Sequence, residues 1–165
     1  MTSAHLRYLL LEQGIGAALF NLAINATIAW LLYRHLAMVP LWGQQGIAGD
    51  TIGTCFFLPF FTGLIVTRLA RGRIRAGKLA PLGWTRESHP SLDWLPRGTV
   101  RRAVALGVLC AVLIALPTVF LLSLLEVTNL RLWTFVTLKA TFAALLAAVV
   151  TPVIGLWAIA DLDGL

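Results

Sequence analysis

Charged residues are scarce in this 165-residue chain. Asp, Glu, Lys and Arg make up only 12% of it, whereas apolar types make up 59%. Soluble domains carry roughly 25% charged residues, because those residues cover the surface that faces water. The mean hydropathy of +0.86 agrees with this shortage. The composition therefore excludes a soluble globular domain, a disordered chain and a coiled coil, and it predicts a protein whose solvent is largely lipid.

Cysteine is equally rare. Cys55 and Cys110 are the only two, each lies in an apolar run, and neither belongs to a C-x-x-C pair. This excludes a disulfide scaffold and a structural zinc site, so we expect two small buried side chains. The sequence also has no phosphate-binding glycine loop, no dinucleotide fingerprint and no hydrolase motif. We therefore expect no cofactor, no metal and no catalytic residue.

The basic residues are concentrated in one place. Lys and Arg total 13 against 7 acidic residues, and nine of the 13 lie between residues 68 and 102. A basic stretch between two apolar runs is typical of a cytoplasmic loop, not of a nucleic-acid site. Both termini are then cytoplasmic, and the excess of Arg over Lys suggests a bacterial inner membrane. Four residues are expected to contact anionic lipid headgroups: Arg71, Arg73, Arg75 and Lys78.

Four apolar segments are long enough to cross a bilayer, at residues 13–36, 50–69, 103–125 and 132–160. The fold class predicted is therefore an all-α integral membrane protein, with residues 1–165 forming one four-helix domain and residues 70–102 a basic cytoplasmic loop. Pro59, Pro117 and Pro152 are expected to kink three of the helices. Because Pro59 lies mid-segment, a re-entrant second segment is the alternative.

Each predicted helix has a stripe of small and polar residues at helical spacing. Small residues and interhelical hydrogen bonds mark helix contacts in lipid, so the four stripes are expected to meet. The stripes either only pack or also line a path. The polar bundle interior predicted in this way comprises Asn21, Asn25, Thr54, Thr118, Thr137 and Thr141.

Lys139 is the only charge well inside a predicted span, and a charge at that depth is a functional hypothesis by default. Its helical angle lies opposite to the Thr stripe of the same segment. We therefore expect the ammonium to snorkel to the outer headgroups. The alternative is an ion pair with Asp50 or Glu126 of a neighbouring subunit.

His35 and Asp50 are the candidates for a site at the outer face. Asp50 could bind a substrate cation at the mouth of the bundle, but a helix cap before Thr51 is the favoured interpretation. Neither residue has partners at the spacing of a metal site or a catalytic triad.

Three functions fit these features. The first is a small oligomeric transporter or channel for a small solute. Transport would be uncoupled or weakly coupled, because no carboxylate lies at mid-depth. The second is an accessory or assembly subunit of a larger membrane complex. The third, a membrane-embedded enzyme acting on lipid or isoprenoid substrates, is the least favoured. The expected partners are therefore anionic lipids and either further copies of the chain or a larger complex, but no nucleic acid.

Overall fold

The computed structural model describes residues 3–82, 84, 96 and 98–160. Four helices in this part of the chain are long and apolar enough to cross a membrane: Ser3–Tyr33, Ile47–Arg75, Thr99–Leu124 and Leu132–Ala160. The four spans predicted from hydropathy are therefore confirmed as helices. The first comprises α1 (Ser3–Arg7), a π-helical segment η1 (Tyr8–Gly16) and α2 (Ala17–Tyr33).

The remaining spans are equally continuous. The second is α3 (Ile47–Arg75), and the fourth is α6 (Leu132–Ala160). The third comprises α4 (Thr99–Cys110), the π-helical segment η3 (Ala111–Ala115) and α5 (Leu116–Leu124), so that Pro117 falls in the first turn of α5. A π-helical turn just before Pro117 is a place where a missing backbone N–H can be accommodated.

The helices extend beyond several of the predicted spans. The helix before the basic loop continues to Arg75, and the next helix begins at Thr99, so residues 76–98 connect the two helices. Residues 83, 85–95 and 97 of that connection lie outside the described part. The re-entrant alternative for the second segment is not observed, because α3 continues through Pro59, which is buried inside it.

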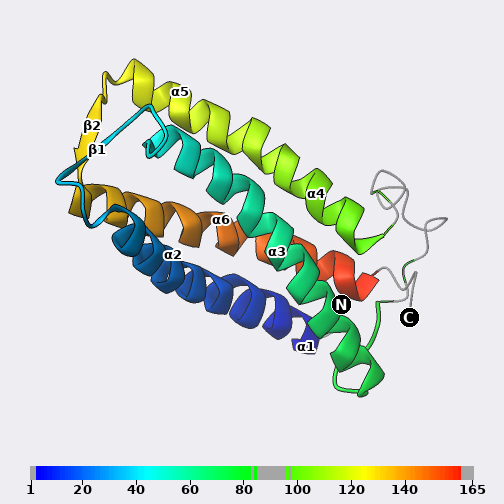
Figure 1. Cartoon of the computed structure of the whole chain (residues 1–165). Coiled ribbons are helices and arrows are strands. Elements are labelled where there is room, and N and C mark those ends of the chain that lie inside the picture. Colours follow the sequence, from blue (N-terminus) through cyan, green and yellow to red (C-terminus); the bar gives the residue numbers. More distant parts are fainter. Residues whose placement is uncertain (1–2, 83, 85–95, 97, 161–165) are drawn as a thin grey trace.

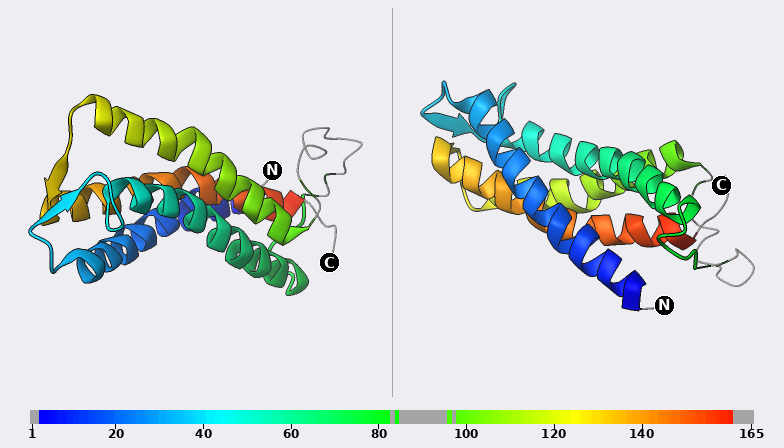
Figure 2. Two further views of the ribbon diagram at one scale, coloured as in Figure 1. Left: turned by 45° about the horizontal axis from the view of Figure 1, so that its top comes forward. Right: turned by 90° about the horizontal axis from the view of Figure 1, so that it is seen from below.

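The helix α6 occupies the middle of the bundle. It packs against α2 on one side and against α3 on the other, and α3 packs in turn against α4 (Figures 1 and 2). This central position explains why α6 has the most extensive buried surface of the four spans. Helices α2 and α3 diverge across α6 and share no substantial contact of their own.

A small sheet closes one end of the bundle. The strands β1 (Met38–Pro40) and β2 (Asn129–Arg131) pair antiparallel and join the two short connections, with Val39 opposite Leu130. The first span begins, and α6 ends, at the opposite end, where α3 also ends and α4 begins (Figure 1). This sheet was not predicted, because the two connections lie about ninety residues apart and neither has a strand pattern.

The sheet covers an apolar cluster that fixes the start of α3. Val39 of β1, Ile47 and Phe135 are almost fully buried in this cluster. The ring of Tyr33 packs edge-on against Phe135, with ring centroids 4.8 Å apart. The turn before α3 is tight, because a Cβ at Gly46 would lie 2.8 Å from the carbonyl oxygen of Leu41. This packing fixes the positions of these ends of α2, α3 and α6 relative to one another.

Candidate functional site

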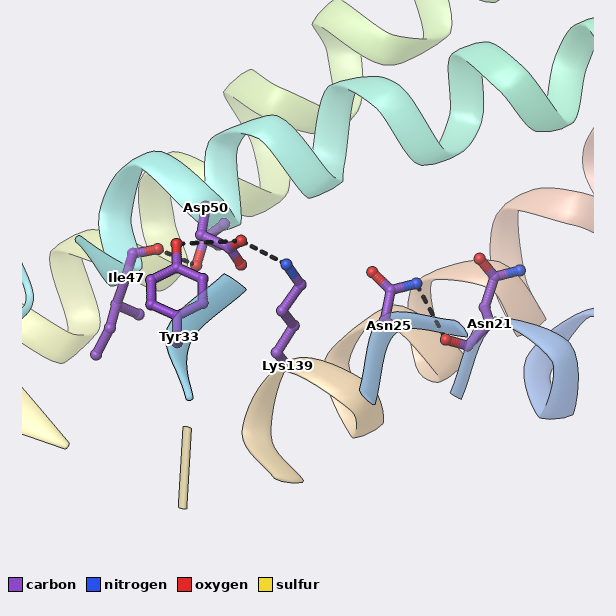
Figure 3. A network of polar contacts seen from close by, with 7 residues as sticks. Asn21, Asn25, Tyr33, Ile47, Asp50 and Lys139 are labelled. Atoms are coloured by element: carbon purple, nitrogen blue, oxygen red, sulfur yellow. Dashed lines mark hydrogen bonds and ion pairs between the residues drawn. The ribbon is translucent and has the colours of Figure 1, made fainter. Parts of the chain in front are cut away.

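A buried ion pair joins the start of α3 to α6. The ammonium of Lys139 donates to the carboxylate of Asp50, and the two side chains are only 6% and 10% exposed. The hydroxyl of Tyr33 donates a longer hydrogen bond to the same carboxylate oxygen, at 3.5 Å (Figure 3). Three helices therefore contribute one polar group each to this cluster.

The favoured interpretation of each charge was wrong, whereas the alternative for Lys139 names Asp50 as its partner. Lys139 does not snorkel but is buried, and its partner belongs to the same chain, whereas Glu126 is exposed beyond the end of α5. Asp50 does not cap a helix: α3 begins at Ile47, and the residue at its N-cap position is Gly46. The carboxylate of Asp50 lies in the first turn, where the helix dipole also favours it.

His35 takes no part in this cluster. Its ring Nε2 contacts the side-chain amide oxygen of Gln45 at 3.2 Å, and both residues are exposed. The predicted pair of outer-face candidates is therefore separated: Asp50 is bound within the bundle, and His35 lies on the connection outside it.

A long groove opens between α2 and α3. Its floor includes Lys139 and Thr151 of α6, and its volume is about 740 Å³. Large apolar side chains form most of the two walls, including Phe20 and Ile24 of α2 and Phe57 and Phe61 of α3. These four residues are exposed in the chain itself. The groove therefore opens sideways, in the direction of the lipid.

Two amides line the α2 wall of the groove. Asn21 and Asn25 are both half-buried, and each donates a side-chain N–H to the carbonyl four residues earlier, at 2.9 and 3.0 Å. These bonds leave both carboxamide oxygens available for other partners. Figure 3 shows the side chains of Asn21, Asn25 and Lys139 rising toward α3 from the same side. The amides thus face the groove and are not glue between two packed helices.

The hydroxyl of Thr151 is the least satisfied polar group in the groove. Thr151 is 1% exposed and lines the floor, yet its Oγ1 has no hydrogen-bond partner among the described residues. A buried hydroxyl without a partner costs about 1–3 kcal/mol. Such a group is expected where a ligand or a water supplies the missing bond.

A second, smaller cavity lies on the other side of the ion pair, between α3, α5 and α6. Its volume is about 40 Å³, enough for a water molecule, since one water needs about 10–15 Å³. Thr51, Thr54 and Thr118 contribute hydroxyls to its lining. Thr54, Asp50 and Lys139 line both this cavity and the groove, so polar groups separate the two spaces.

The predicted polar stripes are only partly brought together. Asn21, Asn25 and Thr54 line the groove, and Thr118 lines the small cavity. Thr137 and Thr141, predicted to lie in the interior, are exposed on the outer face of α6. Threonine is a poor marker of the inner face because its hydroxyl can bond its own helix, as exposed Thr27 does by donating to the carbonyl of Ala23.

The basic residues at the opposite end are also partly engaged. Arg73 pairs with Glu12 of the first span, and its guanidinium lies 5.3 Å from the ring centroid of Tyr8. Arg71 is half-buried between α3, α4 and α6, whereas Arg75 and Lys78 are exposed. Contact with anionic lipid headgroups stays a prediction, and Arg75 and Lys78 are best placed for it.

The fold defines a multi-pass α-helical membrane protein, built from four apolar helices that enclose a buried ion pair and a side-opening groove. Comparison of the chain with protein families, with curated proteins and with solved structures finds no match. The function is therefore inferred from the residues of the site itself.

Proposed function

We propose that this chain is a small, uncoupled carrier of the bacterial inner membrane, with the groove between α2 and α3 as its binding site. The observation that carries the proposal is the groove, which places a charged pair, two amides and an unpartnered hydroxyl along one apolar cleft. Concave, mostly apolar sites with a few convergent polar groups are typical of ligand sites. Because one chain forms the groove, binding needs no second copy, although the carrier could still assemble as an oligomer.

The proposal specifies uncoupled transport because the groove has no carboxylate to spare for a coupling ion. Asp50 and Lys139 are the only charged groups among the described residues that line it, and they neutralise each other. Ion- and proton-coupled carriers instead place ionisable groups along the path. The accessory-subunit alternative predicts that a partner helix covers the opening between α2 and α3.

A ligand screen on the purified protein tests the proposal. A bound solute is expected to raise the melting temperature, because a ligand that binds only the folded state stabilises it. Replacing Asn25 with Leu is expected to raise the Kd obtained from that shift about tenfold, because one net hydrogen bond to the solute is lost. Thr27→Leu is the matched control, since Thr27 lies on the same helix but outside the groove.

Uptake of each stabilising solute into liposomes that contain the protein then tests transport. Uptake is expected without any ion gradient and unchanged by a protonophore. Stabilisation that is equal in wild type and Asn25→Leu would contradict the proposal. Copurification of a stoichiometric partner cross-linked to Phe57 or Phe61 would favour the accessory subunit.

The proposed orientation places the sheet outside the cell and residues 76–98 in the cytoplasm, following the concentration of basic residues. After Cys55→Ala and Cys110→Ala, single cysteines are introduced by Gln44→Cys and by Lys78→Cys, both at exposed positions. An impermeant thiol reagent added to intact cells is expected to label the first and not the second. The reverse pattern would show that the chain is inserted the other way round.

A further inference from the structure

We propose that the groove is a track for the headgroup of a net-neutral, zwitterionic phospholipid, which crosses the membrane along it while the acyl chains stay in the lipid. This inference rests on the proposed function and names its substrate class. It starts from three properties of the groove: its opening to the side, its charge balance and the spacing of its polar groups.

The side opening determines what kind of molecule can enter. The rim residues Phe20, Phe57 and Phe61 are more than half exposed, so acyl chains can contact them directly. A water-soluble solute would have to be wrapped by protein on all sides within the hydrocarbon layer. A lipid needs protein only around its headgroup, because its tails are already in their own solvent.

The charge balance selects a net-neutral headgroup. Asp50 and Lys139 place one negative and one positive charge side by side in the groove. A phosphate can accept from the ammonium of Lys139, and a lipid ammonium can bind the carboxylate of Asp50, so that no charge is left unpaired. A headgroup with a net charge would leave an uncompensated charge in a low dielectric, which is strongly unfavourable.

Polar groups follow one another along the whole length of the groove. With a rise of 1.5 Å per residue, Asn25 and Asn21 lie about 12 and 18 Å from the sheet end of α2. Thr62 lies about 22 Å from the start of α3, and Thr151 about 28 Å from the start of α6. The hydrocarbon core is about 30 Å thick, so these groups form successive steps across it.

The unpartnered hydroxyl of Thr151 fits this role. It lies at the far end of the groove from the ion pair, on the floor, with 1% exposure and no partner among the described residues. A structural threonine would bond its own helix, as Thr51 does by donating to the carbonyl of Ile47 at 2.8 Å. A headgroup at that depth would supply the missing bond once the side chains that cover the hydroxyl move aside.

The test is a leaflet-exchange assay on the full chain reconstituted into phosphatidylcholine liposomes. Acyl-labelled fluorescent phosphatidylcholine or phosphatidylglycerol is the probe, and dithionite bleaches only the outer leaflet. With the wild-type protein, the bleached fraction of phosphatidylcholine is expected to rise from the outer half to nearly all. Asn25→Leu is expected to slow this exchange about tenfold, and Thr27→Leu to leave it unchanged.

Two charge variants test the selectivity. Asp50→Asn leaves Lys139 uncompensated, so it is expected to slow phosphatidylcholine and speed phosphatidylglycerol, changing their ratio about tenfold. The exchanged pair Asp50→Lys with Lys139→Asp restores a neutral groove and should restore the wild-type preference. The SDS unfolding curve of Asp50→Asn itself shows whether a failure of that variant reflects folding or selectivity.

Three outcomes would overturn the inference: equal exchange by wild type and Asn25→Leu, no exchange by folded wild-type protein, or unchanged lipid preference in folded Asp50→Asn. In any of these cases a soluble solute that stabilises the protein through Asn25 would still support the proposed carrier. If Asn25→Leu changed neither the rate of lipid exchange nor the stabilisation by a solute, the carrier proposal would be overturned as well.

Discussion

Replacing Lys139 with Met is expected to destabilise the folded bundle by about 3–5 kcal/mol, the cost of leaving one member of a buried ion pair without its partner. Met keeps the length and most of the volume of the lysine, so the effect isolates the charge. The carboxylate of Asp50 would keep only the long hydrogen bond from Tyr33, in a site that is 10% exposed. Reversible unfolding by SDS in mixed micelles measures the change in free energy.

A second substitution, made in the Lys139→Met background, tests whether Asp50 is the ion-pair partner of Lys139. Adding Asp50→Asn to Lys139→Met is expected to recover most of the loss, because a neutral pair carries no stranded charge. Glu126→Gln is the matched control, since Glu126 is exposed and has no contact with Lys139 to lose. Recovery by Glu126→Gln, or additive losses for Lys139→Met and Asp50→Asn, would contradict the intramolecular pair.

The four spans could be predicted from the sequence because length and hydropathy determine them directly. The burial of Cys55 and Cys110 follows equally simply, and both are buried and free. The sideways groove could not be predicted in the same way. It arises because α2 and α3 both pack on α6 but diverge from each other, a property of helix placement and not of any one helix.

The error at Lys139 has a similar physical origin. The prediction for Lys139 treats each helix as having one narrow inward face, marked by small and polar residues. The central helix α6 has neighbours on two sides, so its buried arc includes Phe135, Lys139 and Leu146, while Thr137 and Thr141 lie outside it. The alternative prediction names Asp50 as a partner but places it on a neighbouring subunit, although Asp50 and Lys139 lie about one and two turns from the same end of the bundle, within reach of each other in one chain.

Gly107→Ala is expected to destabilise the contact between α3 and α4, although alanine is the better helix former by about 1 kcal/mol. A Cβ at Gly107 would lie 2.8 Å from the backbone carbonyl oxygen of Phe56 and 3.0 Å from its ring. The carbonyl belongs to the backbone of α3 and cannot rotate away, so the two helices must separate. The same two helices also approach closely at Gly63, where an added Cβ would lie only 3.1 Å from the Cβ of Ala103. Separating the helices would therefore loosen this second contact as well.

Overpacking of this kind costs about 1–3 kcal/mol, which outweighs the gain in helix propensity. Gly72→Ala is the control, because Gly72 lies in α3 with nothing within 4 Å of its added Cβ. That variant should be neutral or slightly more stable in the same SDS unfolding assay. If Gly107→Ala were as stable as Gly72→Ala, the close approach of α3 and α4 would be wrong. The wall of the groove that α3 forms would then have to be placed differently.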